Sequence, residues 1–179
     1  VFVLDISGSF DDEIESMIQG IAPLLDDPIT SNFRFGLAVI GRQDSGAFEP
    51  PLSRHSEMVT DFVPADEFLQ YLQATQLMDD GGVEPSIDVP LWCMDGSYPF
   101  TWGPGSQKVI ILMTDEQAQT ITNKSTAQVN AYAMDQGFEI FVFALQAHHN
   151  SFLGMVRGEQ NRLYTPAANS ETVFQQIRQ

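Results

Sequence analysis

The chain has 179 residues, of which 43% are hydrophobic, and this length and composition fit one domain with a sizeable core. Its formal net charge is −16, because it carries 24 acidic residues and only 8 lysines and arginines. Such an acidic surface repels phosphate backbones and anionic lipids. It also contains no apolar run of about 18 residues. We therefore expect no nucleic-acid partner and no direct membrane insertion by this domain.

A single cysteine, Cys93, excludes an internal disulfide framework, and we expect it to be a small buried apolar residue. The alternative is that it pairs with a segment outside residues 1–179. The sequence opens on the apolar run Val1-Phe2-Val3-Leu4 without a methionine and stops within a helical pattern. We therefore expect residues 1–179 to form a single domain of a longer protein.

Four apolar runs predict buried strands, because parallel strands covered by helices are apolar on both faces. Two weaker runs predict short edge strands. The four strong runs are Val1–Ile6, Phe33–Gly41, Lys108–Thr114 and Glu139–Leu145, and the two weak ones are Glu57–Val63 and Arg162–Tyr164.

Between the strands, apolar residues recur at helical spacing. The predicted helical segments contain Ile14–Leu25, Phe68–Leu72, Ile87–Met94, Val129–Ala133, Phe152–Val156 and Val173–Ile177. Gly137 is placed to end the fourth of them, and Gln43–Arg54 and Asp95–Ser106 are predicted long loops. Alternating strands and helices predict an α/β fold with a doubly wound, mostly parallel central sheet and helices on both faces.

Polar side chains follow two of the predicted strands. The first strand ends in Asp5-Ile6-Ser7-Gly8-Ser9, and another ends in Thr114-Asp115-Glu116. A third polar segment, Asp79-Asp80-Gly81-Gly82, precedes the third helix. Ligand sites of open α/β sheets form at the carboxyl ends of strands, so we expect the three segments to converge. Carboxylates and hydroxyls in such an array are the ligands that Mg²⁺ prefers.

Each segment alone has a simpler interpretation. Ser7 or Ser9 could be a helix N-cap, Asp115 could cap the segment after its strand, and the Asp-Gly-Gly run could be a plain turn. The metal-site hypothesis depends on all three segments meeting at one edge of the sheet.

The run Asp5-Ile6-Ser7-Gly8-Ser9 after an apolar strand resembles the first motif of the metal-ion-dependent adhesion site of von Willebrand factor A-type domains, the integrin I-like fold. The order of elements along the whole chain also fits this family, and Val109–Asp115 resembles its fourth strand and final metal-site aspartate. The middle motif departs from the threonine form of many members. Asp80-Gly81-Gly82-Val83-Glu84 instead resembles the integrin β-subunit version.

The resemblance implies a metal site formed by Asp5, Ser7, Ser9, Asp80 and Asp115. Asp79 and Glu84 are the alternatives to Asp80 at the third ligand position. The implied ion is Mg²⁺, or Ca²⁺ or Mn²⁺ in its place, and the coordination is completed by an acidic side chain of a protein ligand. The implied function is a non-enzymatic binding or adhesion module in an extracellular or cell-surface setting.

Two other functions remain open. One is a metal-dependent phosphohydrolase on a similar sheet, although Ser7 stands where such an enzyme typically has a second aspartate, and neither Lys108 nor Lys124 is clearly placed for a phosphate. The other is an intracellular scaffold domain with a vestigial metal site. The pair His148-His149 is expected to be a solvated turn rather than a metal site.

Two further hypotheses concern loops and the chain end. Tyr98, Phe100 and Trp102 could form a binding surface, but a loop packed over its own aromatic side chains is the stronger expectation. The last helix, with Val173, Phe174 and Ile177, could shift when a ligand binds, although a static lid on the core is the simpler expectation.

Overall fold

The computed structural model describes residues 1–8, 18–23, 25, 27–41, 56–75, 83–156 and 162–165. These residues form a six-stranded sheet in the order β3-β2-β1-β4-β5-β6. Every neighbouring pair is parallel except β2 and β3, which are antiparallel. The strands are β1 (Phe2–Asp5), β2 (Phe35–Ile40), β3 (Ser56–Val63), β4 (Lys108–Met113), β5 (Phe138–Phe143) and β6 (Leu163–Tyr164).

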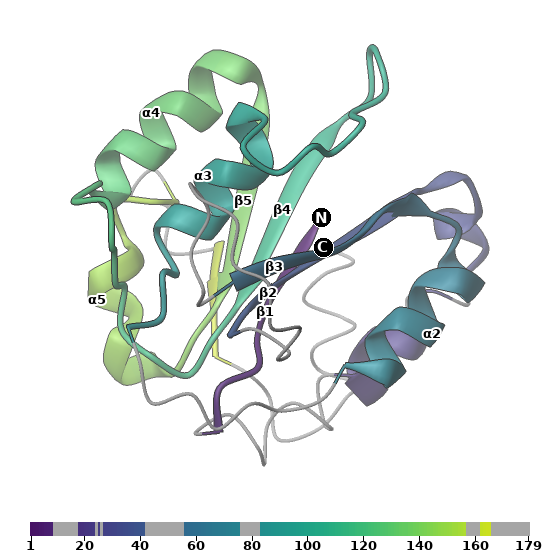
Figure 1. Ribbon diagram of the computed structural model, residues 1–179, viewed down its shortest axis with the longest axis horizontal. Helices are drawn as coiled ribbons and strands as arrows, with labels where there is room; N and C mark the ends of the chain where they lie inside the picture. Colours follow the sequence, from purple (N-terminus) through teal and green to yellow (C-terminus); the bar gives the residue numbers. More distant parts are fainter. Residues whose placement is uncertain are drawn as a thin grey trace.

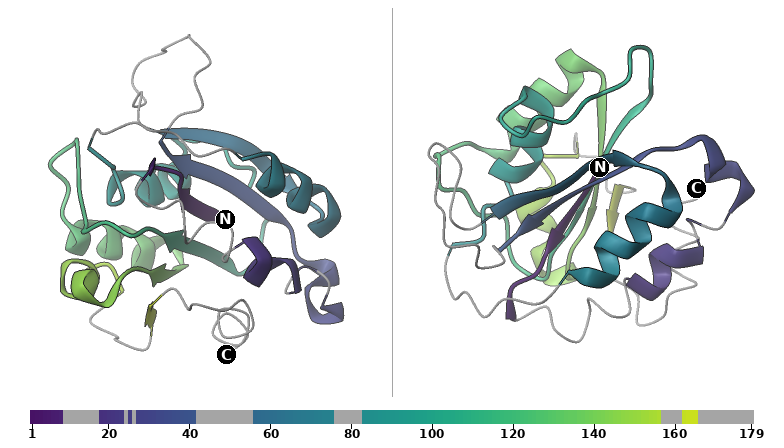
Figure 2. Two further views of the ribbon diagram at one scale, coloured as in Figure 1. Left: turned by 90° about the horizontal axis from the view of Figure 1, so that it is seen from below. Right: turned by 45° about the vertical axis from the view of Figure 1, so that its right-hand side comes forward.

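Helices cover both faces of this sheet, as the doubly wound fold requires. Helix α2 lies on one side, and α3, α4 and α5 lie on the other (Figure 1). The views in Figure 2 show the same separation of α2 from α4. The helices are α2 (Ala65–Ala74), α3 (Asp88–Asp95), α4 (Thr126–Gln136) and α5 (His149–Phe152), with short 3-10 helices η2 (Pro28–Asn32) and η3 (Gln146–His148) and a helical stretch at 18–23. The described part of the chain contains no helix long and apolar enough to cross a bilayer.

Most residues of β1, β2, β4 and β5 are apolar, because each face of the sheet has its own core. In β1, Val3 packs into the core beneath α3 and α4, whereas Phe2 and Leu4 pack into the core beneath α2. On the α2 side, the ring of Phe68 lies 5.3 Å from that of Phe2 and 5.4 Å from that of Phe35, measured between centroids. Burying both faces fixes the strand register, since a slip of one residue would exchange the two sets.

Helix α4 shows how local sequence sets the boundaries. Ser125 and Gln128 form a capping box, in which the Ser125 hydroxyl accepts from the backbone N–H of Gln128 and the Gln128 side chain accepts from that of Ser125. Gly137 ends the helix at φ 73°, a left-handed conformation that glycine adopts without steric cost. The predicted helix end at Gly137 is confirmed.

One predicted helix is wrong in extent. The segment Phe152–Val156 was expected to be helical, but α5 ends at Phe152 and residues 153–156 form turns. Phe152, Met155 and Val156 are all buried, so burial rather than helicity explains the apolar pattern. A Cβ on Gly154 would collide with the Thr126 side chain, which shows how closely this turn approaches α4.

The loop after α3 packs over its own aromatic side chains, as expected. The Tyr98 hydroxyl donates to Oγ of Ser56 at 2.8 Å, and Nε1 of Trp102 donates to the carbonyl of Cys93 at 3.0 Å. Phe100 is also buried. Cys93 is a free and buried thiol, which confirms its apolar role.

Several predicted features lie outside the described residues. These are the start of the first helix, the loop Gln43–Arg54 and the last helix with Val173, Phe174 and Ile177. The hypothesis of a shifting last helix stays a prediction.

Candidate metal centre

Two neighbouring parallel strands bring the first and last acidic segments together. In the β1–β4 register Leu4 pairs with Met113, so Asp5 and Thr114 come next at the same edge of the sheet. The hydroxyl of Thr114 donates to Oδ2 of Asp5 at 2.6 Å, and the backbone N–H of Ser7 donates to Oδ1 at 3.0 Å. Asp5 is fully buried, with 0% exposure, and these two donors fix its carboxylate.

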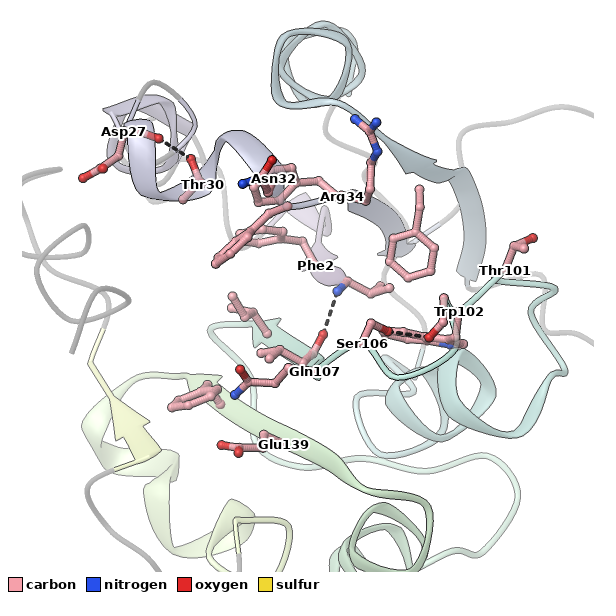
Figure 3. A pocket seen from close by; sticks show the side chains of 18 of the residues that line it. Phe2, Asp27, Thr30, Asn32, Arg34, Thr101, Trp102, Ser106, Gln107 and Glu139 are labelled. Carbon is pink, nitrogen blue, oxygen red and sulfur yellow. Dashed lines mark hydrogen bonds between the residues drawn. The ribbon is translucent and has the colours of Figure 1, made fainter.

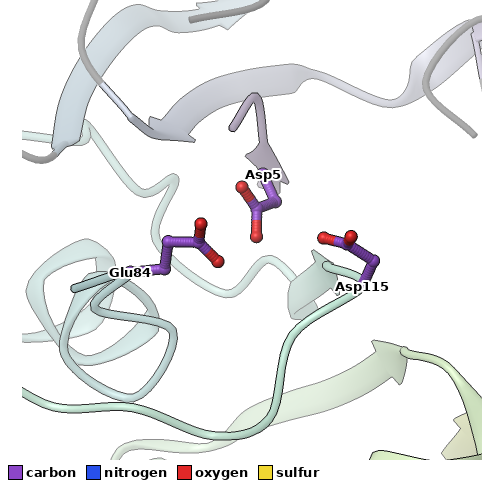
Figure 4. Close-up of side chains that lie close together, drawn as sticks. All are labelled: Asp5, Glu84 and Asp115. Atoms are coloured by element: carbon purple, nitrogen blue, oxygen red, sulfur yellow. The ribbon is translucent and has the colours of Figure 1, made fainter. Parts of the chain in front are cut away.

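The third carboxylate comes from the turn that leads into α3. The backbone N–H of Ser86 donates to the carbonyl of Glu84 at 2.7 Å, and the N–H groups of Asp88 and Val89 both donate to Pro85. Glu84 is 8% exposed. Carboxylate oxygens of Asp5, Glu84 and Asp115 all lie within 4.8 Å of one another and point toward a common centre (Figure 4).

This clustering is unfavourable for the ion-free protein. Burial raises the pKa of Asp5, and the nearby Asp115 carboxylate adds to the rise. Burial, followed by the charge of Asp5, raises the pKa of Glu84 to about 8, against a counteracting hydrogen bond from Ser7. Carboxylates that cannot all ionise together gain a shared counter-charge when a cation binds between them.

The remaining hydrogen-bonding capacity supports the same conclusion. Oε2 of Glu84 and Oδ1 of Asp115 are buried and have no hydrogen-bond partner. A buried acceptor without a partner costs free energy, about 1–3 kcal/mol in proteins. Metal coordination would satisfy both atoms, and an all-oxygen donor set of carboxylates and hydroxyls suits a hard divalent cation. The residues present therefore fit the implied ion.

The structure brings together three of the residues that the sequence singled out, Asp5, Ser7 and Asp115. Ser7 is buried beside Asp5 and hydrogen-bonds to Glu84. Glu84, an alternative for the third ligand position, lies in the cluster. Ser9, Asp79 and Asp80 lie outside the described residues, so the choice of Asp80 and the role of Ser9 stay predictions.

Sequence reasoning missed the residues that hold these ligands in place. Thr114 was noted only as the end of a strand, yet its hydroxyl binds Asp5 and accepts from the backbone N–H of Glu116 at 3.1 Å. Asp88 was assigned no role, yet it is fully buried and binds the loop that follows Asp115. A polar residue within an otherwise apolar helix start was the available signal for Asp88.

Other polar residues are placed away from this cluster. The Lys108 ammonium lies 4.8 Å from the centroid of the Phe138 ring, at the start of β4 rather than at its carboxyl end. Nε2 of His149 lies 3.0 Å from the carbonyl oxygen of Ala144, and neither His148 nor His149 belongs to the carboxylate cluster. Both histidines are half-buried and take part in short helical turns.

A cavity of about 770 Å³ is lined by residues at the starts of β1 and β2 and along β4, β5 and β6 (Figure 3). Phe2, Phe35 and Phe141 contribute much of its apolar lining, and Arg34 and Glu139 add charged groups at its wall. Its lining residues include none of the three clustered carboxylates. The cavity and the carboxylate cluster are separate features.

Comparison with known proteins gives a structural likeness only. No protein-family model and no curated protein matches the chain. Two structures of proximal thread matrix protein 1 from the mussel byssus match with a TM-score of 0.72. The first is 14% identical to this chain, and the second, which is 13% identical, has zinc in its metal-ion-dependent adhesion site (MIDAS) motif. The matches cover 99% of this chain but only 45% and 44% of the mussel protein.

A bacterial structure of similar length also matches. The conserved hypothetical protein BatB from Bacteroides thetaiotaomicron has a TM-score of 0.67 at 15% identity, and the match covers 99% of this chain and 95% of that one. At such identities the likeness establishes the fold alone. It extends over nearly the whole chain, and the predicted α/β fold with a mostly parallel central sheet is confirmed.

Proposed function

We propose that this chain, which has the von Willebrand factor A-type fold, is a non-enzymatic module that binds an acidic protein ligand through a divalent metal ion. The ion would be held by Asp5, Ser7 and Asp115, together with Glu84. Ser9 and Asp80 are further candidate ligands.

One observation carries the proposal. Three carboxylates from three separate segments converge within 4.8 Å, and two of their buried oxygens have no hydrogen-bond partner. A purely structural cluster of acids would be expected to contain a basic residue or a donor for each oxygen. The ion pair between Arg162 and Glu139, on strand β5 and beside β6, lies away from the cluster.

The chemistry of the donors favours Mg²⁺, with Mn²⁺ and Ca²⁺ as substitutes, because every candidate ligand atom is an oxygen. A structurally similar mussel protein has been solved with zinc in its MIDAS motif. That likeness supports a divalent ion at this edge of the sheet, whereas the absence of sulfur and imidazole from the described cluster argues against zinc as the preferred ion here.

The open side of such a centre is suited to a carboxylate, because a hard cation with a free coordination position attracts an anionic oxygen. We infer that the partner is a protein that presents an acidic side chain. The similar byssal thread matrix protein supports an extracellular or cell-surface setting.

Two alternatives have weaker support. A phosphohydrolase would need a general acid where Ser7 stands and a lysine near the phosphate, but Lys108 lies at the start of β4 and Lys124 is exposed in the loop before α4. A vestigial site would have lost ligands, whereas here the acidic ligands converge.

The test is a calorimetric titration of the domain with Mg²⁺ and Mn²⁺. We expect the wild-type chain to bind one ion and Asp5→Asn to lose binding while keeping its fold. Asp61→Asn is the matched control, because Asp61 is a surface acid on β3 that accepts from the backbone N–H of Thr101 at 3.0 Å. Equal loss of affinity in both variants would mean that cations bind only to the acidic surface in general.

A second measurement tests the open position. Water-proton relaxation by bound Mn²⁺ reports exchangeable water on the ion, and acetate should displace that water from the wild-type complex. No effect of acetate would contradict an exchangeable ligand position. We also expect no phosphate release from p-nitrophenyl phosphate with either metal, and turnover abolished by Asp5→Asn would favour the phosphohydrolase.

A further inference from the structure

Residues 114–125, which join β4 to α4, contain no helix or strand. The loop begins beside Asp5 and includes Asp115, so its path sets where the Asp115 carboxylate lies. The Glu84 carboxylate belongs to a different segment, the turn before α3. A metal centre built from both needs a connection that fixes their separation.

Asp88 supplies that connection. It lies in the first turn of α3 with 0% exposure. Its Oδ2 accepts from the backbone N–H of Ile121 at 2.8 Å, and its Oδ1 accepts from the Thr120 hydroxyl at 3.1 Å and from the Thr122 hydroxyl. One buried carboxylate therefore holds three consecutive residues of the loop.

The residues before Asp88 add two more hydrogen bonds to the same loop. Oγ of Ser86 accepts from the backbone N–H of Gln119 at 3.0 Å, and the N–H of Ile87 donates to the carbonyl of Gln119 at 3.0 Å. We call Ser86, Ile87 and Asp88 the α3 clamp. Its first residue also donates its backbone N–H to the carbonyl of Glu84 at 2.7 Å, so the clamp joins the two acidic segments directly.

The buried carboxylate of Asp88 indicates that the loop is held to α3 and not only folded on itself. No ion pair to Asp88 is recorded within the described residues, so hydrogen bonds and the start of α3 compensate for its burial. Hydrogen bonds within the loop are enough to make its turns. For example, Oγ1 of Thr120 accepts from the backbone N–H groups of Thr122 and Lys124, both at 3.2 Å. The buried charge instead ties the loop to the helix.

We propose that Asp88 is a positioning residue of the metal centre, which fixes the separation of the Glu84 and Asp115 carboxylates by locking loop 114–125 to the start of α3. This inference rests on the proposed function, because it requires an ion to bind between those carboxylates. Residues that orient metal ligands typically contribute about 10- to 100-fold to metal affinity.

The test compares Mn²⁺ affinities of the whole 1–179 chain, with Mn²⁺ alone as the probe. Asp88→Asn keeps the shape of the side chain but replaces one acceptor by an amide donor that faces other donors. We expect its Mn²⁺ affinity to fall by about 10- to 100-fold, and the Ile121 amide to exchange hydrogen faster, while near-ultraviolet circular dichroism stays native. Thr122→Val removes one of the loop donors that bind the clamp residue Asp88 and should lower the Mn²⁺ affinity by roughly two- to tenfold, which keeps the proposal testable if Asp88→Asn does not fold.

Tyr98→Phe is the matched control. It deletes the buried hydrogen bond from Tyr98 to Ser56, beyond the other end of α3, and should leave the Mn²⁺ affinity unchanged. Wild-type affinity in folded Asp88→Asn and Thr122→Val would overturn the positioning role. An equal loss in Tyr98→Phe would also overturn it, because the effect would then follow stability. A wild-type chain that binds no Mn²⁺ would overturn the proposed function itself.

Discussion

The Thr114 hydroxyl donates to Oδ2 of Asp5 at 2.6 Å, across the boundary between β4 and β1. Oγ1 of Thr114 in turn accepts from the backbone N–H of Glu116 at 3.1 Å. One side chain therefore orients the Asp5 carboxylate and fixes the backbone on either side of Asp115. The arrangement resembles the outer-shell contacts that orient the ligands of metal sites in general.

Replacing Thr114 by valine should weaken the centre. Thr114→Val keeps the shape of the side chain but leaves Oδ2 of Asp5 without its donor, which we expect to cost about 1–3 kcal/mol in the free energy of unfolding. Mn²⁺ affinity should fall by about 10- to 100-fold. Calorimetric titration and urea unfolding measure the two effects. Thr114→Ser retains the hydroxyl and should stay close to wild type; if it loses as much affinity as Thr114→Val, the hydrogen bond is not the cause.

The fold could be predicted largely because both faces of the sheet are buried. Continuous apolar runs such as Val109–Met113 have few alternatives to a central parallel strand, and every predicted strand is present within one or two residues at each end. The segment after α5 could not be predicted in the same way. Its buried Phe152, Met155 and Val156 have helical spacing, but the close approach of Gly154 to Thr126 is a tertiary contact that no local pattern shows.

The candidate site was predictable where strand ends dictate it. Asp5 is the last residue of β1 and Asp115 follows the adjacent parallel strand β4, so topology alone brings them together. The third carboxylate depends on the path of a loop, and sequence spacing could not decide between Asp80 and Glu84. The roles of Thr114 and Asp88 come from hydrogen bonds between segments 109 and 33 residues apart, which a linear pattern does not reveal.

The turn at Gly154 provides a test of packing between α5 and α4. A Cβ at this position would meet the Thr126 side chain and lie 3.3 Å from the backbone nitrogen of Ala127. Because backbone atoms cannot move aside easily, Gly154→Ala should destabilise the domain by about 1–3 kcal/mol. Gly103→Ala is the control, since its Cβ would meet nothing closer than 3.7 Å. Thermal unfolding that is equal for the two variants would contradict the close contact.

Removing the metal should not unfold the domain. The two hydrophobic cores lie between the sheet and the helices on each of its faces. None of the clustered carboxylates belongs to either core, so the ion is not needed to hold them together. We expect the chain in chelator to keep its native circular dichroism. Added Mg²⁺ should then raise the unfolding free energy by about 2.7 kcal/mol at a hundredfold excess over Kd. Unfolding at room temperature in chelator would show that the ion is structural.

The raised pKa of Glu84 predicts a pH dependence of the ion-free domain. This pKa rises from 4.5 to about 8, first through burial and then through the charge of Asp5. Between these pH values the folded protein holds a proton that the unfolded chain has released. The unfolding free energy contributed by Glu84 is therefore fully present below about pH 4.5 and is lost as the pH rises through about 8.

Comparison with Glu84→Gln isolates this effect from the general repulsion of a chain with a net charge of −16. Between pH 5 and pH 8.5, the melting temperature of the ion-free wild type should fall further than that of Glu84→Gln. Mg²⁺ competes with the same proton, so Mg²⁺ affinity should rise over this range in the wild type. Parallel pH profiles for the two chains would show that Glu84 does not hold the proton.

The final prediction concerns the charge of the centre. When Asp5, Glu84 and Asp115 are all ionised, a divalent ion leaves a net charge of −1, which opposes the approach of another carboxylate. Glu84→Gln removes one negative charge and one strong ligand. We therefore expect Mn²⁺ to bind about tenfold more weakly, whereas acetate should displace water from the bound Mn²⁺ at a lower concentration than in the wild type.

Glu116→Gln supplies the graded comparison, because Glu116 acts on Glu84 only through its charge. Glu116→Gln should also lower the acetate concentration that displaces water from the bound Mn²⁺, but by less than Glu84→Gln does. Its Mn²⁺ affinity should change little. Weaker acetate binding in Glu84→Gln would mean that Glu84 assists the incoming carboxylate instead of opposing it.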